Sequence, residues 1–431
     1  MQNEAGKIAP GNGEHYRVWS VMHHVNVDTL TAEHKRQKTG KATGVDKVTK
    51  EEYGKNLQGN LEDLIARMKR FSYRPQPVRR TYIEKQGSSG SMRPLGIVAY
   101  EDKLVQGAMT NVLNGIYENK FYDFSYGFRK GKSQHQAIKA VDGILMRGQV
   151  NYIVDCDVRG FFDNLDHEWL MKFLEYDIAD KNFLRYIKRF LKSGIIEDLQ
   201  FYESDKGTIQ GGVISPVLAN VYLHYSLDMW FDKVVKARCR GEAHIVRYAD
   251  DFICMFQYKD EAEKFYESLK TRLAKFGLEI AEDKSKVIAF GRSARKESKD
   301  GKVDTFDFLG FTHICGKNRK GYFTIVHRTS RKKMKAKKAS AKEWLRKHMN
   351  DHIKELIPAL NRKLVGHYNY YGISGNYADI SEFYKYVRDE LFRTLRRRGQ
   401  KHRLTWEKFN RILEFNPIAK PSIRVNIWAK A

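Results

Sequence analysis

Two adjacent acidic residues, Asp250 and Asp251, separate two apolar runs of the chain. The runs, residues 243–257 together, have the pattern of a β-hairpin with the acids at its turn. Crowded carboxylates repel one another, and their charge is unfavourable near protein unless a cation neutralises it. Magnesium favours one or two protein carboxylates together with water and substrate phosphates. The pair is therefore a candidate metal site, and the alternative is a solvated acidic turn.

A second acidic cluster, Asp155 and Asp157 on either side of Cys156, ends a short apolar run that is a candidate buried strand. A site for two-metal phosphoryl transfer needs carboxylates that arrive from separate strands and meet at one point. Side chains alternate along a strand, so Asp155 and Asp157 point to the same face and periodicity does not choose between them. The two clusters together predict phosphoryl-transfer chemistry.

The segments around these acids follow the order strand, helix, hairpin, helix, strand between about residues 150 and 290. Apolar residues at helical spacing predict helices over 217–232 and 261–276. This order is typical of an antiparallel sheet with helices on one face, which is an α+β fold. The charged segment 292–303 is predicted to be an exposed loop.

The chain is strongly basic, with 78 lysines and arginines against 52 aspartates and glutamates and a net charge of +26. Such a field attracts polyanions, and binding releases their counterions. Nucleic acid is therefore the expected partner, and the alternative is a basic protein without that role. Residues 325–431 hold 26 basic and 9 acidic residues, which indicates a separate basic, helical module.

The 4 cysteines lie far apart and form no Cys-x-x-Cys pair. This spacing argues against a zinc ribbon and against a disulfide framework. The first residues are polar, and the longest mostly apolar stretch, 212–223, is too short to span a bilayer. We expect a soluble protein without a membrane partner, in a cytoplasmic location such as a bacterial-type cytosol or nucleoid.

Three blocks of the sequence resemble the catalytic motifs of reverse transcriptases encoded by group II introns. They are Tyr-Ala-Asp-Asp at 248–251, Asp-Val-Arg-Gly-Phe-Phe-Asp-Asn-Leu-Asp-His at 157–167, and Gly-Thr-Ile-Gln-Gly-Gly-Val-Ile-Ser-Pro at 207–216. Shorter blocks resemble the same family's fingers motifs (93–97 and 126–129), N-terminal motif (44–46) and primer-grip segment (308–311). In all, the resemblance covers roughly residues 20 to 415.

The resemblance implies an α+β right-hand polymerase, with fingers and a palm built on an antiparallel sheet, followed by an all-α basic thumb. It divides the chain into an N-terminal extension of the fingers (1–75), the reverse transcriptase fingers and palm (76–322), an α-helical thumb or maturase domain (323–403) and a short C-terminal tail (404–431). The His-Asn-His endonuclease that some relatives append is not expected, so the resemblance is to the endonuclease-lacking type.

In this family the catalytic acids hold metal ions, and the matching residues are Asp157, Asp250 and Asp251. The resemblance implies that they bind two Mg2+ ions that bridge the primer 3′-hydroxyl and the incoming triphosphate. The family pattern also favours Asp157 over Asp155. It further implies that Phe162 stacks under the deoxyribose and excludes a 2′-hydroxyl; the alternative is a core aromatic.

Five further positions match residues that bind the nucleotide: Lys85, Arg93, Gln210, Gly211 and Lys284. The first two are expected to grip the triphosphate through charge-assisted contacts. Gln210 and Gly211 are expected to line the template–nucleotide pocket, where glycine lets the backbone approach closely. Lys284 is a candidate for protonating the pyrophosphate; Lys286 in that role and a solvated surface lysine are the alternatives.

Two basic runs near the C-terminus are candidate nucleic-acid contacts. They contain Arg331, Lys332 and Lys335 in the first, and Arg396, Arg397 and Arg398 in the second. For each run the alternative is a solvated helix face. The resemblance implies that this region grips the template–primer and the intron RNA, whereas its aromatic residues, Tyr370 included, are expected to pack in the core.

The predicted function is an RNA-directed DNA polymerase of the group II intron type that copies RNA into cDNA and binds its intron RNA to assist splicing and retromobility. Its partners would be group II intron RNA, template RNA with a DNA primer, dNTPs and target DNA, and the oligomeric state is left open. The alternatives are an RNA-binding maturase with little polymerase activity and a domesticated reverse transcriptase with a defence or CRISPR-associated role.

Overall fold

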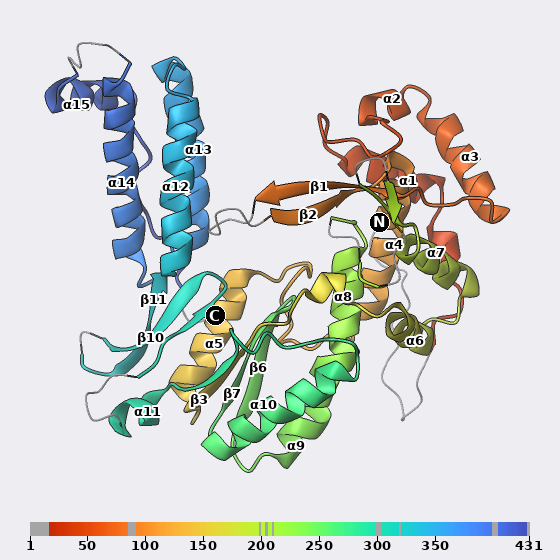
Figure 1. Ribbon diagram of the computed structural model, residues 1–431, viewed down its shortest axis with the longest axis horizontal. Helices are drawn as coiled ribbons and strands as arrows, with labels where there is room; N and C mark the ends of the chain where they lie inside the picture. Colours follow the sequence, from red (N-terminus) through yellow and green to blue (C-terminus); the bar gives the residue numbers. More distant parts are fainter. Residues whose placement is uncertain are drawn as a thin grey trace.

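The computed structural model describes residues 17–84, 92–197, 200–202, 206–208, 211–297, 303–318, 320–398 and 404–428. Figure 1 shows a central sheet, a group of N-terminal helices with a small sheet beside it, and an upright bundle of C-terminal helices. The protein is α+β with a helical C-terminal region, as the sequence predicted.

The central sheet has four antiparallel strands in the order β6-β7-β3-β8, which are Ala243–Tyr248, Asp251–Phe256, Tyr152–Cys156 and Lys286–Ala289. The predicted hairpin is confirmed as β6–β7. Every residue of β7 after Asp251 is buried. Burial without alternation means that protein covers both faces of the sheet.

One face packs against the apolar cluster of α8 (Ser215–Leu223) and α10 (Lys259–Ala274). The other face packs against α5 (Gln134–Arg147) and a second, three-stranded sheet. The strands of this second sheet run in the order β11-β10-β9, which are Phe323–Thr329, Phe311–Lys317 and Phe306–Phe308. The two helices expected between residues 150 and 290 therefore lie on one face of the sheet, as predicted, and segments from outside that range cover the other face.

The N-terminal part holds a mixed sheet in the order β2-β1-β4-β5. Strands β1 (Val78–Glu84) and β2 (Met92–Ile97) form an antiparallel hairpin, while β4 (Ile195–Glu197) runs parallel to β1 and pairs with β5 (Gln200–Tyr202). In Figure 1 the β1–β2 hairpin projects from the N-terminal helices toward the C-terminal bundle. Those helices are α1 (Val27–Arg36), α2 (Lys50–Gly54), α3 (Leu57–Lys69), α4 (Tyr100–Tyr117), α6 (His167–Asp177) and α7 (Lys181–Leu191).

The C-terminal region is built from α12 (Arg331–Lys347), α13 (Ile353–Tyr371), α14 (Tyr377–Arg396) and α15 (Trp406–Phe415). One apolar cluster joins these helices, with Leu356, Leu360 and Leu364 of α13 buried at helical spacing. Strand β11 leads into α12 within two residues and pairs with β10 along its whole length. The sheet β9–β11 therefore connects the central sheet to the bundle.

Residues 292–297 form a short helix, α11 (Arg292–Glu297), where the sequence had predicted a loop. Alanine, lysine, arginine and glutamate favour a helix, and this propensity outweighed the charge that had suggested a loop. The rest of the expected loop, 298–302, lies outside the described residues. Within the described part of the chain, no helix has both the length and the apolar character that a bilayer crossing requires.

Candidate active site

The register of the central sheet brings the two acidic clusters together. Strands β3 and β7 are antiparallel, and their ladder ends at the pair Cys156 and Phe252, so Asp157 and Asp251 are the residues that adjoin this last pair. Tyr248 pairs with Asp251 across the β6–β7 hairpin, which leaves Asp250 in the turn. Three carboxylates from two separate chain segments therefore meet at one corner of the sheet.

The carboxylates at this corner are crowded. Desolvation by the surrounding protein, together with the charges of Asp155 and Asp250, raises the pKa of Asp251 to about 7. Desolvation also raises the pKa of Asp250; the charge of Asp157 adds to this shift, and Arg93 opposes it. The Asp251 side chain still reaches solvent. Oxygen ligands with unfavourable mutual repulsion and an open side fit a bound divalent cation.

Asp155 lies beside this cluster but is not one of the three carboxylates at the corner. It faces Lys286 across β3 and β8. Desolvation raises the pKa of Asp155 to about 6, and the positive charge of Lys286 opposes that shift. Each acid of the second cluster thus has a lysine nearby, Lys286 for Asp155 and Lys284 for Asp157, but Asp155 is half-buried whereas Asp157 is exposed.

A buried ion pair holds the hairpin turn. Arg247 is fully buried, and its guanidinium donates to both carboxylate oxygens of Asp228 at 2.8 and 2.6 Å. It also donates to Asn220 Oδ1 and to the carbonyl oxygen of Ala249, each at 3.0 Å. Asp228 lies at the end of a π-helical turn (His224–Asp228) that continues α8.

The turn itself adopts an unfavourable backbone conformation. Ala249 has a φ of 58°, in the left-handed region that residues other than glycine rarely occupy. Such a conformation costs of order 1–3 kcal/mol and persists only where its surroundings fix it. The hydrogen bond from Arg247 to the Ala249 carbonyl is one such constraint. The sequence motif contained Arg247 and Ala249, but nothing in its spacing revealed Asp228 as the partner.

The segment 126–129, one of the fingers blocks, lies directly against the turn. The Tyr126 N–H donates to the Arg247 carbonyl at 2.8 Å, and the Asn220 side chain donates to the Gly127 carbonyl at 2.7 Å. A Cβ atom on Gly127 would lie 2.2 Å from the backbone nitrogen of Ala249. Only glycine therefore permits this approach.

The turn between β9 and β10 reaches the site from the other side. Leu309 and Gly310 have φ values of 51° and 79°. The Leu309 backbone amide lies near the Asp251 carboxylate and partly opposes the rise in its pKa. Tyr370 of α13 donates its hydroxyl hydrogen to the Leu309 carbonyl at 3.0 Å. Tyr370 also stacks on Phe311, so it packs as expected and in addition contacts a turn at the site.

Several residues predicted to bind the nucleotide lie close to the acids. The Lys284 ammonium is 3.3 Å from a carboxylate oxygen of Asp157, and both side chains are exposed. Arg93, on β2, is exposed, and its charge acts on Asp250. Two of the predicted residues, Lys85 and Gln210, lie outside the described residues.

Phe162 and Gly211 lie on the segments that border the acids. Phe162 is half-buried in a 3-10 turn, and its carbonyl accepts a hydrogen bond from the Thr208 N–H at 2.7 Å. Gly211 has a φ of 109°, and a Cβ there would lie 2.7 Å from the Gly96 carbonyl oxygen. Gly211 therefore packs against the end of β2, near Arg93 in sequence.

The structure does not bring the two basic runs together. Arg331, Lys332 and Lys335 are exposed at the start of α12, while Arg396, Arg397 and Arg398 are exposed at or just beyond the end of α14. In Figure 1 these two helix ends lie at the base and at the far end of the bundle. A helix of 20 residues is about 30 Å long, so the runs are separate surfaces.

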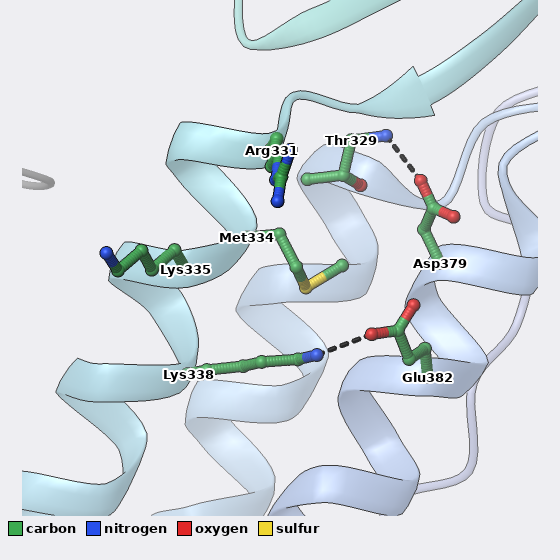
Figure 2. Close-up of a pocket in the computed structure, with 7 residues that line it drawn as sticks. All are labelled: Thr329, Arg331, Met334, Lys335, Lys338, Asp379 and Glu382. Carbon is green, nitrogen blue, oxygen red and sulfur yellow. Dashed lines mark hydrogen bonds and ion pairs between the residues drawn. The ribbon is translucent and has the colours of Figure 1, made fainter.

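The first basic run borders a hollow of about 450 Å3 between α12 and α14 (Figure 2). Acidic residues of α14 lie on its other side: Asp379 accepts a hydrogen bond from the Thr329 N–H, and Glu382 pairs with Lys338. The positive charge of α12 is thus partly neutralised here.

A sheet that gathers carboxylates at a hairpin turn, flanked by a finger-like hairpin and a basic helical bundle, defines a nucleic-acid polymerase of the right-hand type. The chain matches the family "Reverse transcriptase (RNA-dependent DNA polymerase)" over residues 83–313 and "Group II intron, maturase-specific domain" over residues 332–412. It belongs to the reverse transcriptase family, in its group II intron branch, and is an RNA-directed DNA polymerase.

Curated relatives agree with this assignment. The "Group II intron-encoded protein LtrA" of Lactococcus lactis subsp. cremoris is 29% identical over 425 residues, which cover 81% of this chain and 69% of that protein. "Protein YkfC" of Escherichia coli (strain K12) is 32% identical over 315 residues, covering 66% and 78%. The "Uncharacterized 91 kDa protein in cob intron" of Schizosaccharomyces pombe is 34% identical over 174 residues, covering 40% and 21%.

Replacing Gly127 by alanine tests the close approach at the turn. We expect Gly127→Ala to lower the free energy of unfolding by about 1–3 kcal/mol, because the new Cβ overlaps the Ala249 backbone. Urea unfolding measures the change. Gly115→Ala is the matched control, since a Cβ on that helical glycine meets nothing within 4 Å, and it should be neutral or stabilise by up to about 1 kcal/mol. Equal stability of the two variants would contradict the contact.

The raised pKa of Asp251 predicts how stability depends on pH without metal. The pKa in the folded protein, about 7, lies above the ordinary value of 3.8, so stability is lost as pH rises between these values. Asp251→Asn removes this loss. In metal-free buffer we expect the variant to melt at a higher temperature than the wild type at about pH 8 and at the same temperature near pH 4. The control is Glu263→Gln, which changes an exposed acid. If the melting temperatures of Asp251→Asn and the wild type differed by the same amount at every pH, the raised pKa of Asp251 would be contradicted.

Proposed function

We propose that this chain copies RNA into cDNA with two Mg2+ ions held by Asp157, Asp250 and Asp251. The observation that carries the proposal is the end of the β3–β7 ladder, where Asp157 and Asp251 adjoin the last pair beside the turn that bears Asp250, and where the charge of Asp157 acts on both other acids. The all-oxygen ligand set suits Mg2+, and reverse transcriptases generally use divalent metals. When bound, the two ions supply Lewis-acid activation of a primer hydroxyl and neutralise charge on the triphosphate.

The side chains around the acids have roles that follow from their positions. Arg93 lies where its charge reaches Asp250, and we assign to it, with Lys85, the grip on the dNTP phosphates. Lys284 contacts Asp157, whereas Lys286 faces Asp155, so Lys284 is the better candidate for donating a proton to pyrophosphate. Phe162, half-buried on the segment after Asp157, would support the sugar of the nucleotide.

The nucleotide pocket would be completed by the segment that contains Gln210 and Gly211. Gly211 lies against the Gly96 carbonyl of β2, the strand that carries Arg93. The segment is therefore suited to line the space between the template base and the triphosphate.

We assign RNA binding to the basic C-terminal region, which coincides with the maturase-specific match. Its ligands would be group II intron RNA and the template RNA with its DNA primer, and through them it would assist splicing, retromobility and contact with target DNA. The proposal includes the division of the chain into an N-terminal extension (1–75), fingers and palm (76–322), a thumb or maturase domain (323–403) and a C-terminal tail (404–431).

Two other functions share the same fold. A maturase with little polymerase activity would bind RNA but would not need the carboxylate corner. A domesticated enzyme would keep polymerase activity without an intron. The three acids favour a working polymerase, because nothing else in their surroundings accounts for such crowding.

Asp250→Asn tests the metal site. The substitution removes a charge but keeps the shape of the side chain, so we expect primer extension with Mg2+ to fall at least about a hundredfold. RNA binding, measured by filter retention, should stay within a few-fold of wild type. Glu263→Gln, an exposed acid on α10, is the matched control and should extend primers normally. Retained extension by Asp250→Asn would remove that residue from the chemistry.

Neutralising the second basic run tests its place in the RNA interface. Replacing Arg396, Arg397 and Arg398 by glutamine should weaken RNA binding and reduce the slope of log K against log salt by about 2–3, if each arginine neutralises one phosphate. The control removes the same charge elsewhere, as the triple glutamine variant of three exposed lysines: Lys259 and Lys264 on α10, and Lys275 directly after it. A slope that stays at the wild-type value would exclude the run from the interface.

A further inference from the structure

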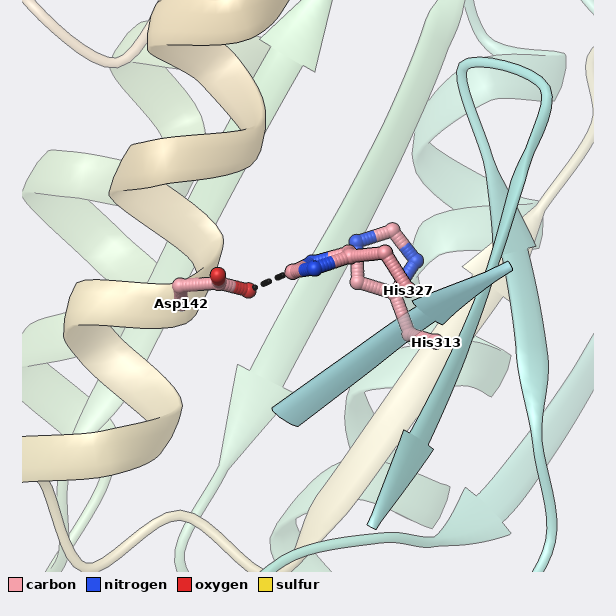
Figure 3. A group of neighbouring side chains, drawn as sticks. All are labelled: Asp142, His313 and His327. Atoms are coloured by element: carbon pink, nitrogen blue, oxygen red, sulfur yellow. Dashed lines mark hydrogen bonds and ion pairs between the residues drawn. The ribbon is translucent and has the colours of Figure 1, made fainter. Parts of the chain in front are cut away.

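A cluster of three buried ligand-type side chains lies apart from the catalytic acids. It consists of Asp142 on α5, His313 on β10 and His327 on β11 (Figure 3). Their ligand atoms all lie within 4.8 Å of one another. His313 and His327 face each other across the antiparallel pair β10–β11, and their exposed fractions are 0%. Asp142, 3% exposed, points at them from the helix that covers this side of the central sheet.

Most of the polar atoms in this cluster have no hydrogen-bond partner. The one bond is between His327 Nε2 and Asp142 Oδ1, at 3.0 Å. The second oxygen of Asp142, Nδ1 of His327 and both ring nitrogens of His313 have none. The carbonyl groups of Phe306 and Phe311 lie near the His313 ring without meeting hydrogen-bond geometry. Buried polar groups are rarely left unsatisfied, so four such atoms at one place call for a ligand.

The surroundings make bulk water a poor candidate for that ligand. Phe306 stacks on the His313 ring with centroids 4.6 Å apart and an interplanar angle of 6°. Phe311 packs edge-on against His327. The cluster is thus buried and bordered by aromatic rings.

We propose that Asp142, His313 and His327 bind a single Zn2+ ion. Two imidazoles and one carboxylate are a donor set that zinc accepts, at bond lengths of about 2.0–2.2 Å. Magnesium instead requires oxygen ligands in an octahedron, so the ion of the catalytic acids does not suit this cluster. Three protein ligands leave one coordination position, which a single enclosed water molecule can fill.

The position of the cluster gives the ion a structural role. It would join α5, which covers the central sheet, to the hairpin β10–β11, which leads into α12. The turn before β10 carries Leu309, whose backbone amide lies near Asp251. Zinc would therefore fix the base of the helical bundle, and this turn, relative to the catalytic sheet.

The metal content of the full-length, untagged protein tests the proposal. After dialysis against a weak chelator, elemental analysis should find about one zinc per wild-type chain. His313→Phe should lose at least about 90% of this zinc, because the phenyl ring fills the same space without a ligand atom. Two controls should keep it: Asp250→Asn, which alters the catalytic acids, and the double alanine variant of His23 and His24, an exposed histidine pair.

Thermal unfolding distinguishes a histidine that binds metal from one that only packs in the core. A strong chelator should lower the melting temperature of the wild type and leave that of His313→Phe unchanged. If the cluster never binds metal, removing an unsatisfied ring should leave the protein as stable as before or more stable, with no response to chelator. That result, together with a zinc-free wild type after reconstitution, would overturn the proposal.

A measurement on the wild type alone covers the case in which His313→Phe does not fold. The metal-free wild type, reconstituted with Co2+, should show the intense visible absorption of a four-coordinate site with imidazole ligands, and equimolar Zn2+ should abolish it. Only the weak absorption of six-coordinate Co2+ would indicate binding at carboxylates and would contradict the assignment.

Discussion

The buried pair of Arg247 and Asp228 is the interaction on which the catalytic corner depends. A charge in a protein interior is tolerated only when it is fully paired and hydrogen-bonded, and this guanidinium meets that condition with two carboxylate oxygens, an amide and a carbonyl. Removing either partner would strand the other charge in the core. The pair therefore fixes β6 against α8, and it keeps the left-handed Ala249 where Asp250 and Asp251 turn toward Asp157.

The same corner lowers the stability of the fold in favour of function. Desolvation, with a further contribution from neighbouring carboxylates, raises the pKa values of Asp251 and Asp250. A fold does not benefit from such crowding, and a polymerase that binds cations does. Closely packed surroundings hold the turn in place. Gly127 lies against the Ala249 backbone on one side of the turn, and the Leu309 amide lies on the other.

A small number of polar contacts connect the helical bundle to the catalytic corner. The Tyr370 hydroxyl on α13 donates a hydrogen bond to the Leu309 carbonyl, and the Leu309 amide lies near Asp251. The sheet β9–β11 that carries this turn is also the element that leads into α12. A nucleic acid that shifts the bundle would therefore act on the segment beside the acids, which gives RNA binding and polymerisation a shared structural element.

The sequence by itself determined the local features: the hairpin around Asp250 and Asp251, the strand that precedes Asp157, the basic C-terminal helices and the family. Apolar periodicity and turn chemistry lie within a few residues, so they can be followed along the chain. Only the tertiary structure decided that α5 covers the second face of the sheet, that Asp228 is the partner of Arg247, and that Tyr370 reaches the site. Only the tertiary structure brings Asp142 next to His313 and His327, since Asp142 precedes both histidines by more than 150 residues in the chain. The physical reason is that such contacts depend on packing between distant segments, and each partner alone has no periodic pattern that reveals the other.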